Sequence, residues 1–230
     1  MKSAESLVDM PERAYRVYLV ELLRQELNDP KLGAEIGVAV GGTSRVLLRE
    51  FNSLTLWMVD CWTTFEELHP YRLSGDRRAR MTLDQQLGRM QEARNVTAFA
   101  GKRAYIVRSK SDIAVRSVDD GTMDFVFIDG AHDARSVTID LKAWYSKVRH
   151  GGIFCGHDYG STKYTGVKKS VDAFANKFRL VLRFGEGPAC SVWWHRKGEF
   201  HDDGDKASQT DGTMDKGLRL AQDEGWISWS

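Results

Sequence analysis

Cysteine is scarce in this chain. Its 230 residues include three cysteines, Cys61, Cys155 and Cys190, which are too few and too scattered for a disulfide framework or a zinc cluster. A chain of this length can bury a core that needs no covalent or metal staple. We therefore expect reduced thiols, which are typical of a cytoplasmic protein.

Long apolar runs and an excess of one charge are also missing. No run approaches the roughly 20 apolar residues that span a bilayer, and the opening MKSAESLVDM lacks the apolar core of a signal peptide. Lysine and arginine total 33 against 32 acidic residues, a formal net charge of +1, so no global field favours nucleic acid. These absences predict a soluble cytoplasmic protein that binds neither membranes nor nucleic acids.

The most informative segment is residues 125–158, FVFIDGAHDARSVTIDLKAWYSKVRHGGIFCGHD. Two short apolar runs flank a stretch in which Val137, Leu141, Trp144, Tyr145 and Val148 have the spacing of one helical face. A strand, a crossover helix and a second strand form a βαβ unit with parallel strands. The polar residues after both strands therefore meet at one sheet edge, where open α/β sheets bind ligands. They are Asp129, His132, His157 and Asp158.

A glycine-rich turn lies earlier, in EIGVAVGGTS at residues 35–44. Apolar residues up to Val38 predict a strand, and Thr43 or Ser44 can cap the helix that follows. Such a turn exposes backbone N–H groups to a ligand, although an ordinary tight turn has the same composition. Asp60 ends the next apolar strand, about 20 residues on, where an acid can accept hydrogen bonds from ribose hydroxyls.

Strands and helices alternate through most of the chain, which predicts an α/β fold with a doubly wound, seven-stranded, mostly parallel sheet. The last two strands, near residues 180–184 and 191–195, are joined by a short link. They should form a hairpin, so an edge strand is expected to run antiparallel. Residues 61–80 lack periodicity and are interpreted as a lid or binding loop, whose arginines at 77, 78 and 80 form a solvated face.

Three regions are expected. Residues 1–30 form an N-terminal packing helix, residues 31–197 the main domain, and residues 198–230 a polar, mobile tail. Aromatic residues in the first helix and the tail are candidate interface material, which leaves a homo-oligomer open.

The order of elements resembles the class I S-adenosylmethionine-dependent methyltransferase fold, which is Rossmann-like, over residues 31–197. EIGVAVGGTS looks like the first motif of that superfamily, and Asp60 matches its ribose-binding acid. FIDGAHDARSVTIDLKAW with GGIFCGHDY is similar to a narrower branch, the small-molecule O-methyltransferases that include the macrolide and aminocoumarin sugar enzymes. The resemblance implies methylation of a hydroxyl on a small-molecule acceptor, which could be a sugar, a polyketide or a phenol.

The resemblance also implies a cofactor site for S-adenosylmethionine. Its residues would be Glu35, Gly37, Ala39, Gly41, Asp60, Cys61, Trp62, Ser111 and Asp129. In this assignment the glycine turn approaches the methionine part and Asp60 holds the ribose. Cys61 and Trp62 border the adenine, and Ser111 meets its edge.

In the sugar-type and catechol-type relatives, the acid ending strand four and two adjacent residues after strand five bind magnesium. Those positions are Asp129, His157 and Asp158, and the base that takes the hydroxyl proton corresponds to His132. Asp129 and His132 are thus the implied catalytic residues. His157 departs from the oxygen donor usual there, because imidazole suits zinc, manganese, iron or nickel better than magnesium. Magnesium on two carboxylates, a softer metal and no metal all stay open.

Two other functions compete with this interpretation. A nicotinamide-dependent oxidoreductase could use a similar sheet, but its glycines would run G-x-G-x-x-G, whereas here they run G-x-x-x-G-G. A binding module that keeps the fold without catalysis is the second alternative, because fold alone does not determine function. The departure at His157 gives that second alternative some weight.

Overall fold

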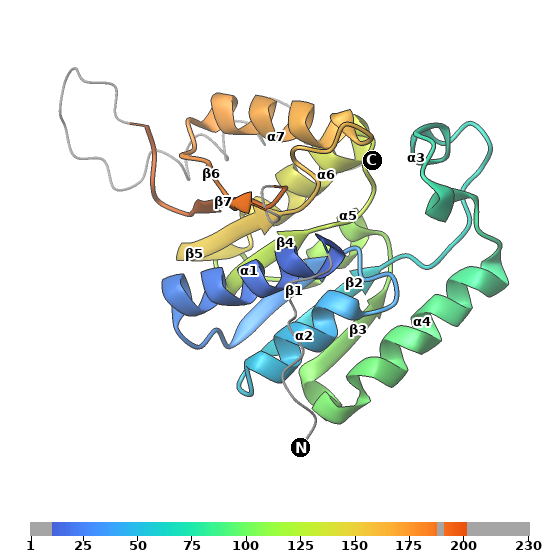
Figure 1. Ribbon diagram of the computed structural model, residues 1–230, viewed down its shortest axis with the longest axis horizontal. Coiled ribbons are helices and arrows are strands. Elements are labelled where there is room, and N and C mark those ends of the chain that lie inside the picture. The colour runs from blue at the N-terminus through green and yellow to red at the C-terminus, as the bar shows by residue number, and fades with distance from the viewer. Residues whose placement is uncertain (1–10, 188–190, 202–230) are drawn as a thin grey trace. The chain divides into compact units, whose positions relative to one another are not determined.

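A seven-stranded sheet lies at the centre of the computed structural model, which describes residues 11–187 and 191–201 (Figure 1). The strand order is β3-β2-β1-β4-β5-β7-β6. Neighbours are parallel from β3 through β5, so the carboxyl ends of those strands share one edge. The strands are β1 (Leu32–Ile36), β2 (Thr55–Asp60), β3 (Ala104–Arg108), β4 (Met123–Ile128), β5 (Val148–Gly156), β6 (Arg183–Phe184) and β7 (Trp193–Arg196).

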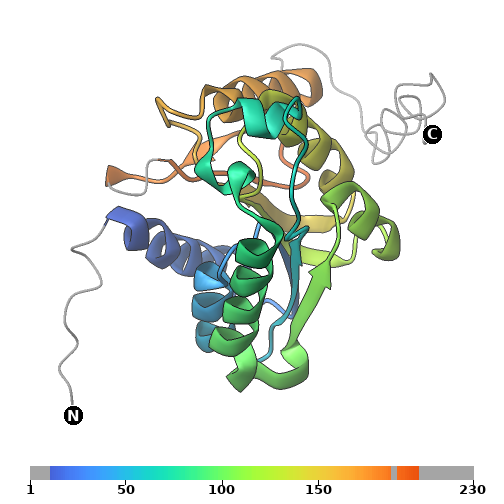
Figure 2. The same cartoon turned by 90° about the vertical axis from the view of Figure 1, so that its right-hand side faces the viewer.

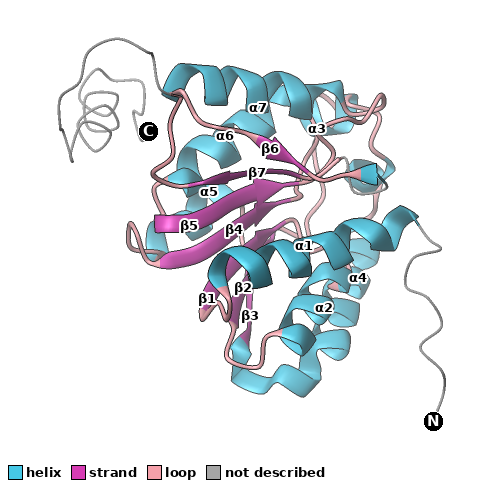
Figure 3. Cartoon of the chain, turned by 60° about the vertical axis from the view of Figure 1, so that its left-hand side comes forward, coloured by secondary structure: helices cyan, strands magenta, loops and turns pink. Residues whose placement is uncertain are grey.

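Helices cover both faces of the sheet (Figure 3). One layer contains α1 (Pro11–Leu27), α2 (Gly42–Glu50) and α4 (Leu83–Thr97), which contact one another in that order. The other layer contains α5 (Ser111–Ala114), α6 (Ala134–Tyr145) and α7 (Thr165–Phe178). The chain changes layer between β1 and β4, where the strand order reverses. The predicted doubly wound α/β fold is confirmed.

Apolar side chains on the inner helix faces meet the apolar strands. In the first layer, Leu19, Leu23 and Leu47 are fully buried against the sheet. In the second, Trp144 and Tyr145 of α6 are buried, as the helical spacing predicted. Val148 is not on that helix face but begins β5, because α6 ends at Tyr145 and the strand is longer than its apolar part.

The end of the sheet differs from the prediction in one respect. The last strand, β7, is antiparallel to both β5 and β6, as expected. It does not lie at the edge, because β6 pairs on its outer side and is itself the edge strand. The side chains of Trp193, Trp194 and His195 point alternately to both faces and all are buried, which requires a covered, internal strand.

Near its C-terminus the described chain stays attached to the sheet. Phe200 forms a β-bridge with Leu180, and Glu199 pairs with Arg183 at 2.6 Å. One compact unit ends at Phe200. The remainder of the predicted tail, after His201, lies outside the described residues, as does Cys190.

Two smaller expectations concern thiols and membranes. Cys61 and Cys155 are both free, and Cys155 is buried in the core. Within residues 11–187 and 191–201, no helix is both long and apolar enough to cross a bilayer.

Candidate active site

A cavity of about 360 Å³ opens at the carboxyl ends of β1, β2 and β4. It lies at the point where the strand order reverses, which is where open α/β sheets bind ligands. Residues 61–80 contribute to its wall and contain the short helix α3 (Pro70–Leu73) and the 3-10 helix η1 (Arg77–Arg80). Figure 2 shows this segment above α4, and α3 also contacts α6. The segment predicted to be a binding loop therefore borders the cavity.

Most of the predicted cofactor residues reach this cavity. Those on its wall are Gly37, Ala39, Asp60, Cys61, Ser111 and Asp129. The other three, Glu35, Gly41 and Trp62, lie behind the wall and hold it in place. The structure thus brings residues separated by almost 100 positions of sequence to one ligand-sized space.

The glycine turn packs directly on the end of β4. Gly37 has a φ of +97°, and its N–H donates to the Val59 carbonyl at 2.8 Å. A Cβ atom at Gly37 would lie 2.2 Å from the Asp129 carbonyl oxygen. Only glycine permits both this backbone conformation and this approach. The turn can therefore present bare backbone beside Asp129.

The helix after the turn begins differently from the prediction. Its N-cap is Gly41, in the left-handed conformation with a φ of 77°, and no side chain caps it. Thr43 and Ser44 lie inside the first turn instead. Thr43 accepts a hydrogen bond from Arg16 Nε at 3.2 Å, and the Ser44 hydroxyl donates to Glu35. These hydroxyls bind side chains that are distant in sequence and therefore do not cap the helix.

Glu35 supports the turn from below. Its side chain is almost fully buried at the end of β1, where it accepts the Ser44 hydrogen bond. Burial raises the pKa of Glu35 to about 8, because a carboxylate loses its hydration there. The Ser44 hydrogen bond ties β1 to the first turn of α2.

Asp60 joins the two turns that border the cavity. Its carboxylate accepts hydrogen bonds from the backbone N–H of Ala39 at 2.9 Å and of Trp62 at 3.0 Å. The Trp62 indole N–H donates in turn to the Ala39 carbonyl at 2.9 Å. Trp62 is fully buried and faces the core, whereas its neighbour Cys61 lines the cavity. Burial raises the pKa of Asp60.

Ser111 lies on the opposite wall, at the start of α5. Its hydroxyl donates to Asp140 of α6. Burial raises the pKa of Asp140 to about 7. The pair links α5 to α6 beside the place where the resemblance puts the adenine.

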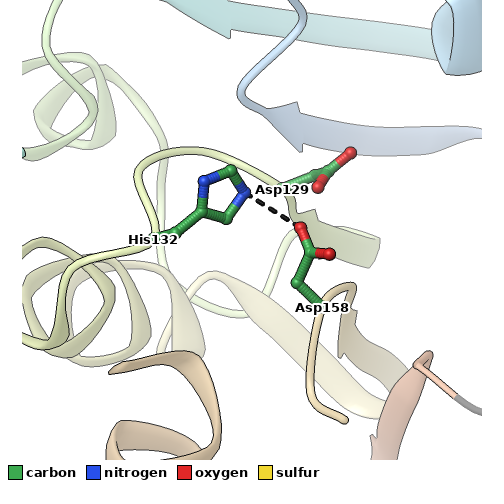
Figure 4. Close-up of side chains that lie close together, drawn as sticks. All are labelled: Asp129, His132 and Asp158. Carbon is green, nitrogen blue, oxygen red and sulfur yellow. Dashed lines mark ion pairs between the residues drawn. The ribbon is translucent and has the colours of Figure 1, made fainter. Parts of the chain in front are cut away.

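His132 is held between two carboxylates next to the cavity. Its Nδ1 lies 2.9 Å from Asp76 Oδ2, and its Nε2 lies 2.9 Å from Asp158 Oδ2 (Figure 4). The ring stacks on Tyr164, with centroids 4.0 Å apart. Burial alone would lower the pKa of His132, but Asp158 and Asp76 raise it to about 9. Burial would raise the pKa of Asp76, but its hydrogen bond with His132 lowers that pKa to about 2.

The two nitrogens of His132 are not equivalent. Nδ1 makes a hydrogen bond to Asp76, whereas Nε2 is buried and has no well-aligned hydrogen-bond partner among the described residues. The short Nε2 contact with Asp158 is therefore an ion pair without good hydrogen-bond direction. The contact is short, but its poor alignment leaves Nε2 without an effective hydrogen bond, because hydrogen-bond strength falls steeply with angle. A buried donor or acceptor of this kind is suited to a ligand.

His157 borders the same corner from β5. Its Nδ1 is 3.6 Å from Asp129 Oδ1 and 3.5 Å from Asp158 Oδ2, and its Nε2 is 2.9 Å from the Ser191 hydroxyl. The ring packs on Tyr15, with centroids 4.1 Å apart. Burial would lower the pKa of His157, but Asp129 and Asp158 raise it to about 9.

The candidate metal ligands are only partly those predicted. Asp129 and Asp158 come together, and the third side chain with a ligand atom within 4.8 Å of both is His132 (Figure 4). The predicted third ligand, His157, directs Nδ1 toward the two carboxylates from outside this group. Two carboxylates beside an imidazole nitrogen without an aligned partner fit a divalent cation by donor chemistry.

Sequence reasoning missed Asp76 altogether. It lies in the aperiodic 61–80 segment, 56 positions before His132, and is buried there. The turn composition around Gly75 resembles that of an ordinary exposed loop. Only the unusual isolation of one acid between basic residues could have drawn attention to it. All three arginines, Arg77, Arg78 and Arg80, are solvent-exposed as predicted, but sequence reasoning did not foresee that Arg78 also lines the cavity.

The tight packing of Gly37 leads to a stability prediction. We expect Gly37→Ala to reduce the free energy of unfolding by about 2 to 5 kcal/mol, through the positive φ and the clash with Asp129. Urea unfolding followed by circular dichroism measures the change. Gly101→Ala is the matched control, because Gly101 has a φ of +57° but open space around its Cβ position. Equal losses in the two variants would contradict the packing argument.

The fold and the cavity define an α/β protein with a ligand-sized site where the strand order reverses, and comparisons narrow this. No curated protein matches the sequence. Among solved structures, the O-methyltransferase NovP superposes with a TM-score of 0.58 at 18% identity, covering 80% of each chain. CalS11, a calicheamicin methyltransferase, gives 0.61 at 15% identity, covering 82% of this chain and 80% of its own. At these identities the likeness shows the fold alone.

Another neighbour is the methyltransferase PaMTH1 of Podospora anserina, whose structure contains bound S-adenosylhomocysteine (SAH). It superposes with a TM-score of 0.56 at 12% identity, covering 83% of each chain. A family model described as a methyltransferase domain matches residues 34–159, more than half of the sequence. The chain belongs to this methyltransferase domain family, and it uses S-adenosylmethionine as methyl donor. The predicted Rossmann-like methyltransferase fold is confirmed.

Proposed function

We propose that the protein transfers the methyl group of S-adenosylmethionine to a hydroxyl oxygen of a small molecule. The observation that carries this proposal is the position of His132 Nε2. It lies buried beside Asp158, without an aligned partner, at the end of the cavity that Asp129 lines. A group able to take a proton thus stands next to the place where cofactor and acceptor would meet.

The cofactor would occupy the cavity between the two turns. Asp60 would bind the ribose hydroxyls, and the backbone of Gly37 and Ala39 would contact the methionine part; all three line the cavity. Cys61 and Ser111 would border the adenine. Trp62 would act from the core, by fixing the Ala39 carbonyl rather than by touching the base.

The chemistry needs alignment and the removal of one proton. The acceptor oxygen attacks the methyl carbon, the carbon–sulfur bond breaks, and its electron pair stays on sulfur to give SAH. The hydroxyl proton passes to His132 Nε2, which requires that ligand binding first lower the pKa of His132 from the value of about 9 that Asp158 and Asp76 impose. Asp76 favours this direction, because a carboxylate only accepts hydrogen bonds and therefore keeps the neutral ring protonated on Nδ1. Holding the reactants in line supplies most of the acceleration.

His132 must be uncovered for this step, since its side chain is only 3% exposed. Tyr164 covers one ring face, and Asp76 of the 61–80 segment covers the Nδ1 edge. Catalytic contacts in a ligand-free site often become productive only in the complex. We therefore include a displacement of this segment in the proposal.

A divalent metal is part of the proposal as an aid to the acceptor. Asp129 and Asp158 would hold it, with His157 Nδ1 as third ligand, because Nε2 of His132 is needed for the proton. When bound, such an ion lowers the pKa of a hydroxyl and orients it. Its charge would also offset the two carboxylates that raise the pKa of both histidines.

Metal binding has a readout that is independent of activity. We expect added Mg²⁺ or Mn²⁺ to raise the melting temperature of the purified protein, with about 2.7 kcal/mol gained at 100 times the Kd. Asp158→Asn should abolish the shift, because one carboxylate ligand is lost. Asp119→Asn, on an exposed acid outside this cluster, is the control and should keep it. A shift that survives in Asp158→Asn would place the metal elsewhere.

Calorimetric titration with SAH tests the cofactor part of the proposal. We expect one site per chain, and failure of a folded sample to bind would overturn it. Methyl transfer is then assayed by SAH release over a panel of hydroxylated sugars and phenols. Binding without turnover on any acceptor would favour the non-catalytic alternative.

A further inference from the structure

The cavity carries positive charge that the cofactor does not require. Its wall contains four permanently basic side chains, Arg78, Arg89, Lys110 and Arg135. S-adenosylmethionine has two positive centres and one carboxylate, so it can neutralise at most one of these cations. Of the four aspartates on the same wall, Asp60 is occupied by two backbone N–H groups and Asp140 by Ser111. The four cations and four aspartates balance formally, so the case for a second anionic ligand rests on the cations that lack a direct partner.

Arg78 and Arg89 are the best candidates for that ligand. Neither guanidinium has an ion pair or hydrogen bond with a side chain or carbonyl in the described part of the chain. Arg78 lies on η1 and Arg89 on α4, so the two approach the cavity from successive elements. Arg78 is exposed and Arg89 is partly buried, and a partly buried cation normally has such a partner.

The electrostatics show that the two arginines share one region. Burial lowers the pKa of Arg89, and the charge of Arg78 lowers it further. Burial also acts against Arg78, but Asp76 and Asp129 raise its pKa. Arg78 is thus within electrostatic reach of the corner where we place the reaction. Asp60 acts on Arg89 from a distance in the same way, but none of these carboxylates forms an ion pair with either guanidinium among the described residues.

The backbone around Arg78 is held firmly. Its N–H donates to Asp76 Oδ1 at 2.9 Å, and its carbonyl accepts from Gln86 Nε2 at 3.0 Å. Gln86 is buried on α4, one turn before Arg89. These bonds fix η1 against α4, so the spacing of the two arginines is built into the structure rather than left to a free loop.

We propose that Arg78 and Arg89 form an oxyanion subsite for the methyl acceptor, whose class is a hydroxylated small molecule bearing a phosphate, diphosphate or carboxylate. This inference rests on the proposed function. Guanidinium groups suit it, since they bind phosphate and carboxylate oxygens through paired N–H groups. The subsite would anchor the acceptor and direct its hydroxyl toward Asp129 and His132.

The test is an anion titration of the protein saturated with SAH. Inorganic pyrophosphate and acetate are titrated calorimetrically, with EDTA present so that pyrophosphate does not act through a metal. We expect pyrophosphate to bind the wild type, and Arg78→Gln or Arg89→Gln to weaken it at least about tenfold, as loss of a charge-assisted contact implies. The SAH affinity of both variants should stay within about threefold of wild type, a change of under 1 kcal/mol.

Arg77→Gln and Arg80→Gln are matched controls. Both residues lie on η1, are exposed and do not line the cavity, so pyrophosphate affinity should change less than about twofold. An equal loss of pyrophosphate affinity in these controls would show that only the net charge of the protein matters, and it would overturn the subsite. Arg78→Lys keeps the charge and should retain part of the affinity, and SAH binding by each variant shows that it folds.

Two outcomes would contradict the inference, and a third would narrow it. Pyrophosphate and acetate could both fail to bind the SAH complex of the wild type. SAH affinity could fall together with anion affinity, which would assign the arginines to the cofactor carboxylate. Acetate binding as tightly as pyrophosphate would restrict the acceptor to a carboxylate and remove the phosphate class. Titration without SAH distinguishes the anion subsite from the proposed methyl transfer. If the protein binds pyrophosphate through Arg78 but never binds SAH, the subsite stands and the methyl-transfer proposal fails.

Discussion

Replacement of His132 by glutamine is expected to lower kcat by about 100- to 10,000-fold, the range typical of a lost general base. Glutamine can still hydrogen-bond Asp76, but it cannot take a proton. The affinity for SAH should change little, because His132 does not line the cofactor cavity. Single-turnover methyl transfer, measured with enzyme in excess, isolates the chemical step from product release.

The control for His132 is His150→Gln. His150 is exposed and lies near the start of β5, at the opposite end of that strand from His157. Its replacement should leave kcat and SAH binding unchanged. If His132→Gln retains wild-type turnover, the proton leaves by another route, and the base assignment fails even though the cofactor site stands.

Asp76→Asn should reduce kcat by about 10- to 100-fold, the usual effect of removing a carboxylate that orients an active-site histidine. Asparagine keeps an oxygen that can accept the Arg78 N–H, so the start of η1 is preserved. Its amide donor, however, would face Nδ1 of His132 and favour the proton on Nε2. The ring would then present the wrong nitrogen to the acceptor.

A double-mutant cycle distinguishes this positioning role from a structural one. In the His132→Gln background, Asp76→Asn should cost no further rate, because its effect passes through the ring. SAH affinity and KM for the acceptor should change far less than kcat. Asp84→Asn, at an exposed acid on α4, is the control. Additive losses would show that Asp76 acts only through the stability of the 61–80 segment.

The sequence predicted the elements well where apolar spacing was strong. The strands around residues 125–128 and 153–155, the helix between them and the strand ending at Asp60 appear as expected. These segments are apolar enough to require burial, and their spacing leaves little choice of structure. Boundaries were less certain, as Val148 shows, because a strand can extend beyond its apolar part through backbone hydrogen bonds alone.

Local rules failed where a side chain found a distant partner. Thr43 and Ser44 are good capping residues, yet they bind Arg16 and Glu35, and Gly41 begins the helix. In the same way, the short link before β7 predicted a hairpin but not its place inside the sheet. That place depends on the backbone pairing of Trp193 and Trp194 with distant strands on both sides, which no short-range pattern contains.

By itself the sequence determined that Asp129, His132, His157 and Asp158 would gather at one edge of a parallel sheet, because strand ends in βαβ units converge. It also placed the glycine turn and Asp60 at the cofactor side. Only the tertiary structure decided which groups touch. It joined His132 to Asp76 and drew Arg78 and Arg89 into the cavity. An aperiodic segment has no spacing that reveals its contacts, so its residues acquire their roles only when it packs across the sheet edge.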